Sequence, residues 1–236
     1  MKRMLFVLAA ALMPMLAAAG QGIVTSDTTI NTHGKSVRLS VQGGYAYRLG
    51  KVDKSQGDVM TEHAKSLRHG FTYGADATWY FMDFFGAGVK YNSLHVGNAE
   101  RVTVSYDDGT TASGTMEDKI NIWFLGPFAS YRLAGGNTRG SLLFNFGVGY
   151  MGYKDNATLV DSFMIKGGTA GLLYEIGYDL ALTDKISLGA MMTYASGYLS
   201  KCKTNTSGTW QTVTLEKGRY ERLDYLNLSI GIRINL

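Results

Sequence analysis

Six ionisable residues of this 236-residue chain lie on the polar face of segments whose apolar residues fall on every second position. In the last segment, apolar residues alternate from Leu226 to Leu236, and Arg233 lies between Ile232 and Ile234. A period of two is the period of a β-strand, because successive side chains leave opposite faces of the backbone. Three cations and three anions could form a closed network of ion pairs, or a selectivity ring along an ion path. The six residues are Arg38, Asp76, Lys90, Glu175, Asp179 and Arg233.

Catalysis would need a different set of residues. The four histidines are His33, His63, His69 and His95. If His69 and His95 meet at the ends of neighbouring strands, Ser66 or Ser93 could be close, and a histidine beside a serine can attack an acyl group. No acidic residue is fixed by spacing to orient the imidazole, so we expect solvated histidines, no catalytic residue and no cofactor. The pair also lacks a third ligand at a suitable spacing, so we expect no metal site.

Eight alternating segments must position these side chains. The connections between them alternate in length: 82–84, 134–139 and 183–185 are as short as hairpin turns, whereas 49–68, 97–118, 154–167 and 200–219 are long and polar. An even number of antiparallel strands with short turns at one end and long loops at the other is typical of outer-membrane barrels. The eight segments span about residues 36–48, 69–81, 85–96, 119–133, 140–153, 168–182, 186–199 and 220–236.

A secreted soluble barrel of the lipocalin type also has eight strands, so the two faces of each strand must decide between the alternatives. In the segment from Leu142 to Met151, large apolar residues alternate with a mostly small set that includes Asn145, Gly147 and Gly149. The interior of an eight-stranded barrel is only just wide enough for side chains, so small residues suit the inside and large ones face lipid. We predict an all-β, eight-stranded antiparallel up-and-down transmembrane barrel with Arg233 inside.

Two further patterns support this prediction. Aromatic residues gather near both ends of the strands, as in the two interfacial girdles of membrane barrels. A turn centred on Asp83 would place Asp76 directly across from Lys90, and Asp179, Arg233 and Arg38 fall at similar heights above the short turns. The aromatic residues are Tyr45, Tyr47, Tyr91, Tyr150, Tyr194 and Tyr198 near the long loops, and Trp79, Phe81 and Phe85 near the short turns.

The first residues, "MKRMLFVLAAALMPMLAAAGQG", combine a basic start, an apolar stretch and a small-x-small site. We expect a signal peptide at 1–19, a short periplasmic lead at 20–35 and the barrel at 36–236. Pro14 and the short apolar run argue against an anchoring helix, which needs about 20 residues. Without Lys2 and Arg3 the chain has 21 basic and 19 acidic residues, which gives no argument for nucleic acid. The single cysteine, Cys202, cannot form an internal disulfide.

These residues resemble the small eight-stranded outer-membrane barrels of Gram-negative bacteria, the OmpA- and OmpX-like membrane domains. The resemblance covers most of the chain after the signal peptide and is carried by "INIWFLGPFASYRL", "FNFGVGYMGYKDN", "ISLGAMMTYASGYLSK" and "YLNLSIGIRINL". It implies an outer-membrane location and recognition of the final strand by the outer-membrane insertion machinery. That strand usually ends in an aromatic residue in these families, whereas here it ends in Leu236.

The long loops carry the remaining candidates for function. The loop at 97–118 is acidic and the loop at 200–219 is basic, so Lys201, Lys203 and Trp210 could contact lipopolysaccharide phosphates or a partner. Alternatively, both loops are solvated hairpins that extend strands above the membrane. We expect a side-chain-filled lumen and a structural or surface-interaction role exerted through the loops. A narrow solute channel and a lipid A-modifying enzyme remain the alternatives.

Overall fold

The computed structural model describes residues 36–50, 65–105, 111–134, 139–158, 162–206, 208–216 and 220–236. The chain divides into two units, Met1–Thr32 and His33–Leu236, and all described residues belong to the second. The expected signal peptide at 1–19 and lead at 20–35 lie outside the described residues, as do His33 and His63. In the described part, no helix is long and apolar enough to cross a membrane.

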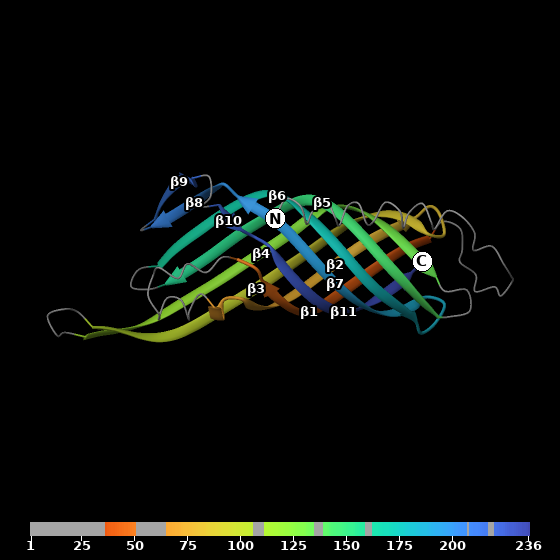
Figure 1. Ribbon diagram of the computed structural model, residues 1–236, viewed down its shortest axis with the longest axis horizontal. Coiled ribbons are helices and arrows are strands. Elements are labelled where there is room, and N and C mark those ends of the chain that lie inside the picture. The colour runs from red at the N-terminus through yellow and green to blue at the C-terminus, as the bar shows by residue number, and fades with distance from the viewer. Residues whose placement is uncertain are drawn as a thin grey trace, which may run out of the picture. The chain divides into compact units, whose positions relative to one another are not determined.

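Eight antiparallel strands form a closed barrel, in which each strand pairs with its neighbours in the sequence and the last strand pairs with the first (Figure 1). The predicted fold class is therefore confirmed. The barrel strands are β1 (Ser36–Arg48), β2 (His69–Tyr80), β3 (Phe85–Ser105), β4 (Thr111–Ala134), β5 (Gly140–Thr158), β6 (Ser162–Ala181), β7 (Ile186–Leu199) and β11 (Tyr225–Asn235).

Two short strands lie in the stretch that we had predicted to be the long loop at 200–219, and a third lies at the start of the predicted last strand at 220–236. β8 (Lys201–Thr206) continues beyond β7 as the partner of β6, and β9 (Thr209–Thr214) folds back on β8. Gly208, at the turn between them, has a φ of 88°, a conformation that glycine adopts without strain. β10 (Glu221–Arg222) pairs with the end of β7.

The predicted loops at 97–118 and 154–167 were also too long. β3 and β4 pair as far as Ser105 and Thr111, and β5 and β6 pair as far as Thr158 and Ser162. Apolar alternation stops well before these positions, because beyond the membrane neither face of a hairpin needs to be apolar. The backbone hydrogen bonds of the two arms nevertheless continue. Strand ends read from hydrophobic alternation therefore mark the end of the apolar band and not the end of the pairing.

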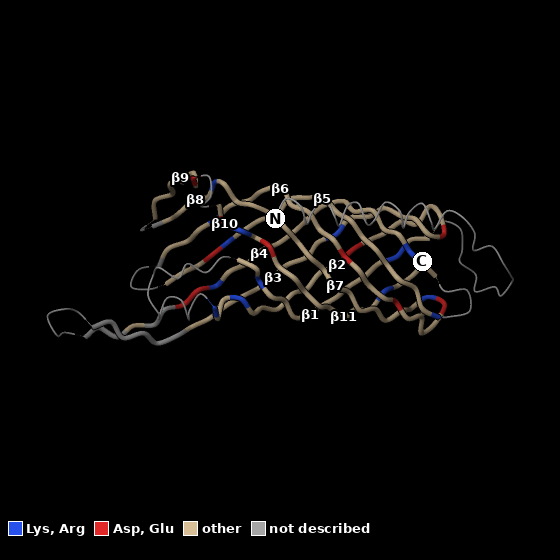
Figure 2. Tube along the Cα trace, viewed as in Figure 1, with Lys and Arg blue, Asp and Glu red and all other residues tan. Residues whose placement is uncertain are grey.

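Side chains alternate between the lumen and the outside along most of each strand. In β2 the burial alternates residue by residue from Phe71 to Tyr80, and β7 shows the same pattern. The outer face is strongly apolar, with Val41 61% exposed, Leu228 61% and Ile230 69%. Charged residues are few along the strands and more frequent near the strand ends (Figure 2). A continuous apolar outer face of this kind is what a barrel presents to lipid.

The lumen is filled by two layers of different character. Toward the short turns it holds buried polar and charged side chains, among them Arg38, Lys90 and Arg233. Toward the long loops it holds an apolar cluster that includes Leu94, Ile122, Phe124, Met151 and Leu173. The apolar layer is absent from the sequence-based prediction, because these residues lie on strand faces that also carry glycine and polar residues.

The seam between β1 and β11 closes the barrel, and small inward residues allow the two backbones to approach there. Gly44 pairs with Ser229, and a Cβ atom at Gly44 would overlap the carbonyl oxygen of Leu228. The adjacent Gly43 points outward, and a Cβ atom there would lie 3.5 Å from its nearest neighbour, the carbonyl oxygen of Thr72.

We expect Gly44→Ala to weaken barrel closure, because backbone atoms of β11 would have to shift. Gly43→Ala is the matched control and should leave closure intact, since its new methyl group meets only ordinary contacts. The measurement is the temperature at which the compact, heat-modifiable band disappears on a denaturing gel. Equal temperatures for the two variants would contradict the close approach at this seam.

Candidate functional site

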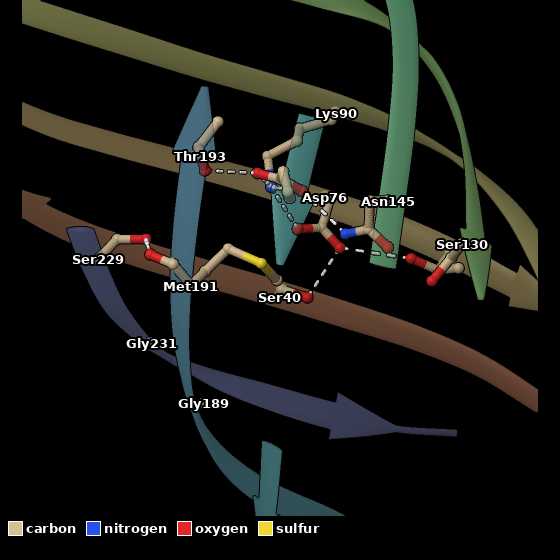
Figure 3. A network of polar contacts seen from close by, with 12 residues as sticks. Ser40, Asp76, Lys90, Ser130, Asn145, Gly189, Met191, Thr193, Ser229 and Gly231 are labelled. Atoms are coloured by element: carbon tan, nitrogen blue, oxygen red, sulfur yellow. Dashed lines mark hydrogen bonds and ion pairs between the residues drawn. The ribbon is translucent and has the colours of Figure 1, made fainter. Parts of the chain in front are cut away.

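The centre of the lumen holds a lysine between two carboxylates. Lys90 Nζ lies 2.8 Å from Glu175 Oε1 and 3.4 Å from Asp76 Oδ2, and its side chain is fully buried (Figure 3). Asp76 and Lys90 are direct cross-strand partners on β2 and β3. Glu175 comes from β6, three strands further along the sheet, so the Lys90–Glu175 pair joins opposite walls of the barrel.

The other three ionisable residues continue from Asp76 toward the short turns. Arg38 Nη2 lies 3.8 Å from Asp76 Oδ1, and Arg38 Nη1 donates a hydrogen bond of 3.0 Å to Asp179 Oδ2. Arg233 Nε lies 3.1 Å from Asp179 Oδ1, and Arg233 Nη1 donates to the carbonyl oxygens of Gly189 and Gly231. All six sequence-derived residues therefore meet in one chain of alternating charge: Glu175, Lys90, Asp76, Arg38, Asp179 and Arg233.

Neutral polar side chains complete the hydrogen bonding of this charge chain. Thr193 and Asn145 each donate a 2.8 Å hydrogen bond to Glu175, and Ser40 donates one of 2.8 Å to Asp76 (Figure 3). Buried ions are tolerated only when they are paired and their remaining lone pairs are satisfied. The arrangement meets both conditions at Glu175 and Asp76, so it can fill and fasten the lumen.

Sequence reasoning missed the residues that close the short-turn end of the lumen. The guanidinium carbon of Arg132 lies 4.2 Å from the centroid of the Tyr80 ring, and Arg38 lies over the same ring at 5.4 Å. Tyr80 is 1% exposed and hydrogen-bonds to Ser130. Arg132 lies on the same face of β4 as Ser130 and Phe128, because every second residue of a strand points to the same side. This alternation could have identified Arg132 as a residue that points into the lumen.

The two described histidines lie on the outer surface near the long loops, and each contacts its own set of residues. His69 Nδ1 contacts the hydroxyl of Tyr45. His95 Nε2 lies 3.1 Å from Ser93 Oγ, and the amide nitrogen of Asn121 lies 3.0 Å from the same hydroxyl. Ser93 is completely buried, so its hydroxyl is not open to an incoming acyl group. Within the described residues, no group of three His, Cys, Asp or Glu side chains could hold a metal ion.

A second polar cluster lies on the loop side of the apolar layer. Arg48 pairs with Glu221, and Arg222 pairs with the buried Asp224. Nearby, burial raises the pKa of the Asp155 carboxyl to about 6, although a hydrogen bond from the Tyr153 hydroxyl acts in the opposite direction. The Arg48–Glu221 pair ties β10 to β1, and hydrogen bonds from Ser196 and the Gly197 backbone to Asp224 tie the start of β11 to β7.

The basic candidates of the fourth loop lie on the β8–β9 hairpin. Lys201 and Lys203 are exposed on the outer face of β8, whereas Cys202 between them is buried and free. Trp210 of β9 is 44% exposed, and the Lys166 ammonium lies 5.1 Å from its ring centroid. The structure therefore places all three predicted contact residues on one hairpin outside the barrel wall.

The fold is shared with solved membrane proteins. A major outer membrane protein from Thermus thermophilus superposes with a TM-score of 0.55 and 12% identity, over 86% of this chain and 100% of that one. The chain has the fold of a bacterial outer-membrane barrel. OprG from Pseudomonas aeruginosa (TM-score 0.47, 16% identity, 87% and 98% of the two chains) and neisserial surface protein A (0.44, 14%, 86% and 97%) are also similar to this outer-membrane barrel. No protein-family model and no curated protein sequence matches the chain.

The charge chain predicts strong coupling between Asp76 and Lys90. Either Asp76→Ala or Lys90→Ala leaves a buried charge without one of its partners, which costs about 3–5 kcal/mol of unfolding free energy. We expect the double variant to lose less than the sum of the single variants, with a coupling of about 1–3 kcal/mol. Urea titration of the refolded barrel measures these free energies.

A matched control pairs Asp76→Ala with Lys185→Ala. Lys185 is exposed in the turn before β7 and forms no ion pair with a described residue. The effects of this second pair should add. Additive effects for Asp76 and Lys90 as well would show that the two charges do not depend on each other.

Proposed function

We propose that the protein is an integral outer-membrane barrel with an occluded lumen, and that its role is structural or lies in surface interactions made at the loop end. The observation that carries this proposal is the fully buried Lys90, which bridges Asp76 and Glu175 across the lumen. Open aqueous channels belong to barrels of about 16 strands, whereas an eight-stranded barrel is just wide enough for its own side chains.

The outer surface supports the location and the orientation of the barrel. Apolar side chains cover the outer face of the strands, with aromatic pairs such as Trp79–Phe81 near the short turns and Trp123–Tyr150 near the long loops. Such barrels have short turns in the periplasm and long loops outside the cell. We therefore place the β8–β9 hairpin and the extended ends of β3 to β6 on the cell surface.

The partners in this proposal are outer-membrane lipid, lipopolysaccharide and the outer-membrane insertion machinery, without nucleic acid. The insertion machinery would read β11, whose outward residues from Leu226 to Leu236 form one aliphatic face. A protein partner at the surface could add a strand to β9, because every residue of β9 is exposed and the described strands pair with only one of its edges.

Two other functions receive less support from the geometry. A solute channel would need a water path past Arg38, Asp76, Lys90 and Glu175, all of which are buried and held in ion pairs of 2.8–3.8 Å. A lipid A-modifying enzyme would need an accessible nucleophile, and the serine beside His95 is buried. We therefore propose neither a channel nor a catalytic activity.

Planar-bilayer recording tests the occluded lumen. We expect no discrete conductance steps after the refolded protein inserts, because the charge chain and the apolar layer fill the lumen. Heat-modifiable gel mobility of the same preparation serves as the control for folding. Conductance steps whose size changes in Lys90→Gln would overturn the proposal and assign the lumen to an ion path.

A further inference from the structure

Five hydrogen-bonding or basic residues form one row across the outer surface, at the loop end of the barrel. Each residue is the direct cross-strand partner of the next: His95 of β3, Asn121 of β4, Lys154 of β5, Lys166 of β6 and Lys203 of β8. Direct partners on one face have Cβ atoms about 4.5–5.5 Å apart. We call this set the outer basic row. Its three lysines occupy three neighbouring strands.

Within the part of the chain that the structure describes, the lysines of the outer basic row have no anionic partner. Like charges directly opposite each other on a sheet are destabilising. Among the described residues, no acidic side chain forms an ion pair with Lys154, Lys166 or Lys203; the acidic residue on the neighbouring outer face, Glu117, is paired with Lys119 at 2.6 Å. An anion bound along the row would remove this repulsion.

A surface hollow adjoins the row. It has a volume of about 550 Å³, and its lining includes Tyr73, His95, Asn121, Lys154 and Lys119. The Tyr73 ring stacks on the His95 ring at a centroid distance of 5.2 Å, which gives the hollow an aromatic wall. Amide, imidazole and ammonium groups all donate hydrogen bonds, and the ammonium groups add positive charge. A phosphate group is the ligand that such a set of donors fits.

The height of the row indicates that the phosphate belongs to a lipid. Trp123 and Tyr131 lie in the loop-side and turn-side aromatic groups, eight residues apart on β4. At about 3.4 Å per residue and a tilt of about 40°, this separation is about 21 Å along the barrel axis, close to the apolar band of about 25 Å in such barrels. Asn121 is two residues further along, so the row crosses β4 about 5 Å beyond its loop-side aromatic residue. Because the strands are tilted, the row lies further from the bilayer centre at β5, β6 and β8. That is the level of the head groups in the outer leaflet.

We propose that the outer basic row and its hollow bind the phosphate groups of a phosphorylated glycolipid of the outer leaflet, with its acyl chains against the apolar wall below. The inference rests on the proposed membrane location and orientation. It adds a defined lipid site to them. The β8–β9 hairpin contributes to this site through Lys203, and the Trp210 ring of β9 contacts the Lys166 ammonium.

Lipid binding in phosphatidylcholine nanodiscs tests the site, with lipid A and dephosphorylated lipid A as the probes and native mass spectrometry as the readout. The unmodified protein should retain lipid A more tightly than its dephosphorylated form. Each lysine near a membrane surface contributes about 1 kcal/mol, so Lys154→Gln/Lys166→Gln should weaken lipid A binding by roughly thirtyfold. The charge-conserving Lys154→Arg/Lys166→Arg should retain it.

The matched control is Arg139→Gln/Lys185→Gln, which removes the same charge from exposed residues near the short turns and should bind lipid A normally. Equal binding by the two glutamine variants would overturn the site, as would equal retention of the two lipids. Displacement by inorganic phosphate at equal concentration would assign the site to free phosphate. If the unmodified protein gives a dimer mass that is missing for Lys154→Gln/Lys166→Gln, the row would bind a second copy of this chain and the lipid site would be overturned.

Heat-modifiable mobility of each variant separates this test from that of the proposed function. A protein that fails to fold and insert contradicts the membrane barrel itself. A folded, inserted barrel without preference for the phosphorylated lipid contradicts only the lipid site.

Discussion

The structure depends on the pairing of charges inside a lumen too narrow for water to solvate them separately. A buried ion costs several kcal/mol unless a partner of opposite sign and good hydrogen bonds offset its desolvation, with about 3–5 kcal/mol lost when one partner is removed. Glu175, Lys90 and Asp76 satisfy this requirement only when β2, β3 and β6 are at their observed register and the barrel is closed. The charge chain is therefore a condition on the whole fold, since five strands must be correctly placed before all six charges are paired.

The same constraint fixes which face of each strand meets lipid. A slip of one residue in β11 would move Arg233 to the outside and turn the aliphatic face of the strand inward. An exposed arginine costs about 2–4 kcal/mol at the centre of the bilayer and less toward the interface, where Arg233 lies. Small residues such as Gly44 let the walls approach closely enough for the side chains to fill the space. The apolar layer above the charges then seals the lumen toward the loops. Outside the wall, the lysines of the outer basic row are unpaired with any described acidic residue, which contrasts with the complete pairing of the lumen.

Local features of this fold could be predicted from the sequence, and features that depend on closure could not. The alternation of apolar and polar residues predicted the eight barrel strands. The turn around Asp83 predicted that Asp76 lies opposite Lys90, and the two residues are direct partners. The contact between Lys90 and Glu175 depends on the barrel radius, because the two residues lie on opposite walls. The length of the extended arms of β3 to β6 could not be predicted, because hydrogen bonds between polar arms leave no hydrophobic period. Hairpins that extend the strands were only an alternative prediction, for the loops at 97–118 and 200–219. Arg132 was missed although its parity points inward, since its stacking on Tyr80 is a tertiary contact.

The most direct test of the paired, water-excluding lumen is the exchange rate of the Lys90 ammonium protons, measured by NMR on the refolded barrel with ¹⁵N-labelled lysine. A charged, buried and hydrogen-bonded Lys90 predicts slowly exchanging protons that remain visible at neutral pH, with the exposed Lys185 as the fast-exchanging reference. Asp76→Asn, which keeps the shape of the side chain, should speed this exchange. If the Lys90 protons exchange with water as fast as those of Lys185, the lumen is hydrated and the account is wrong.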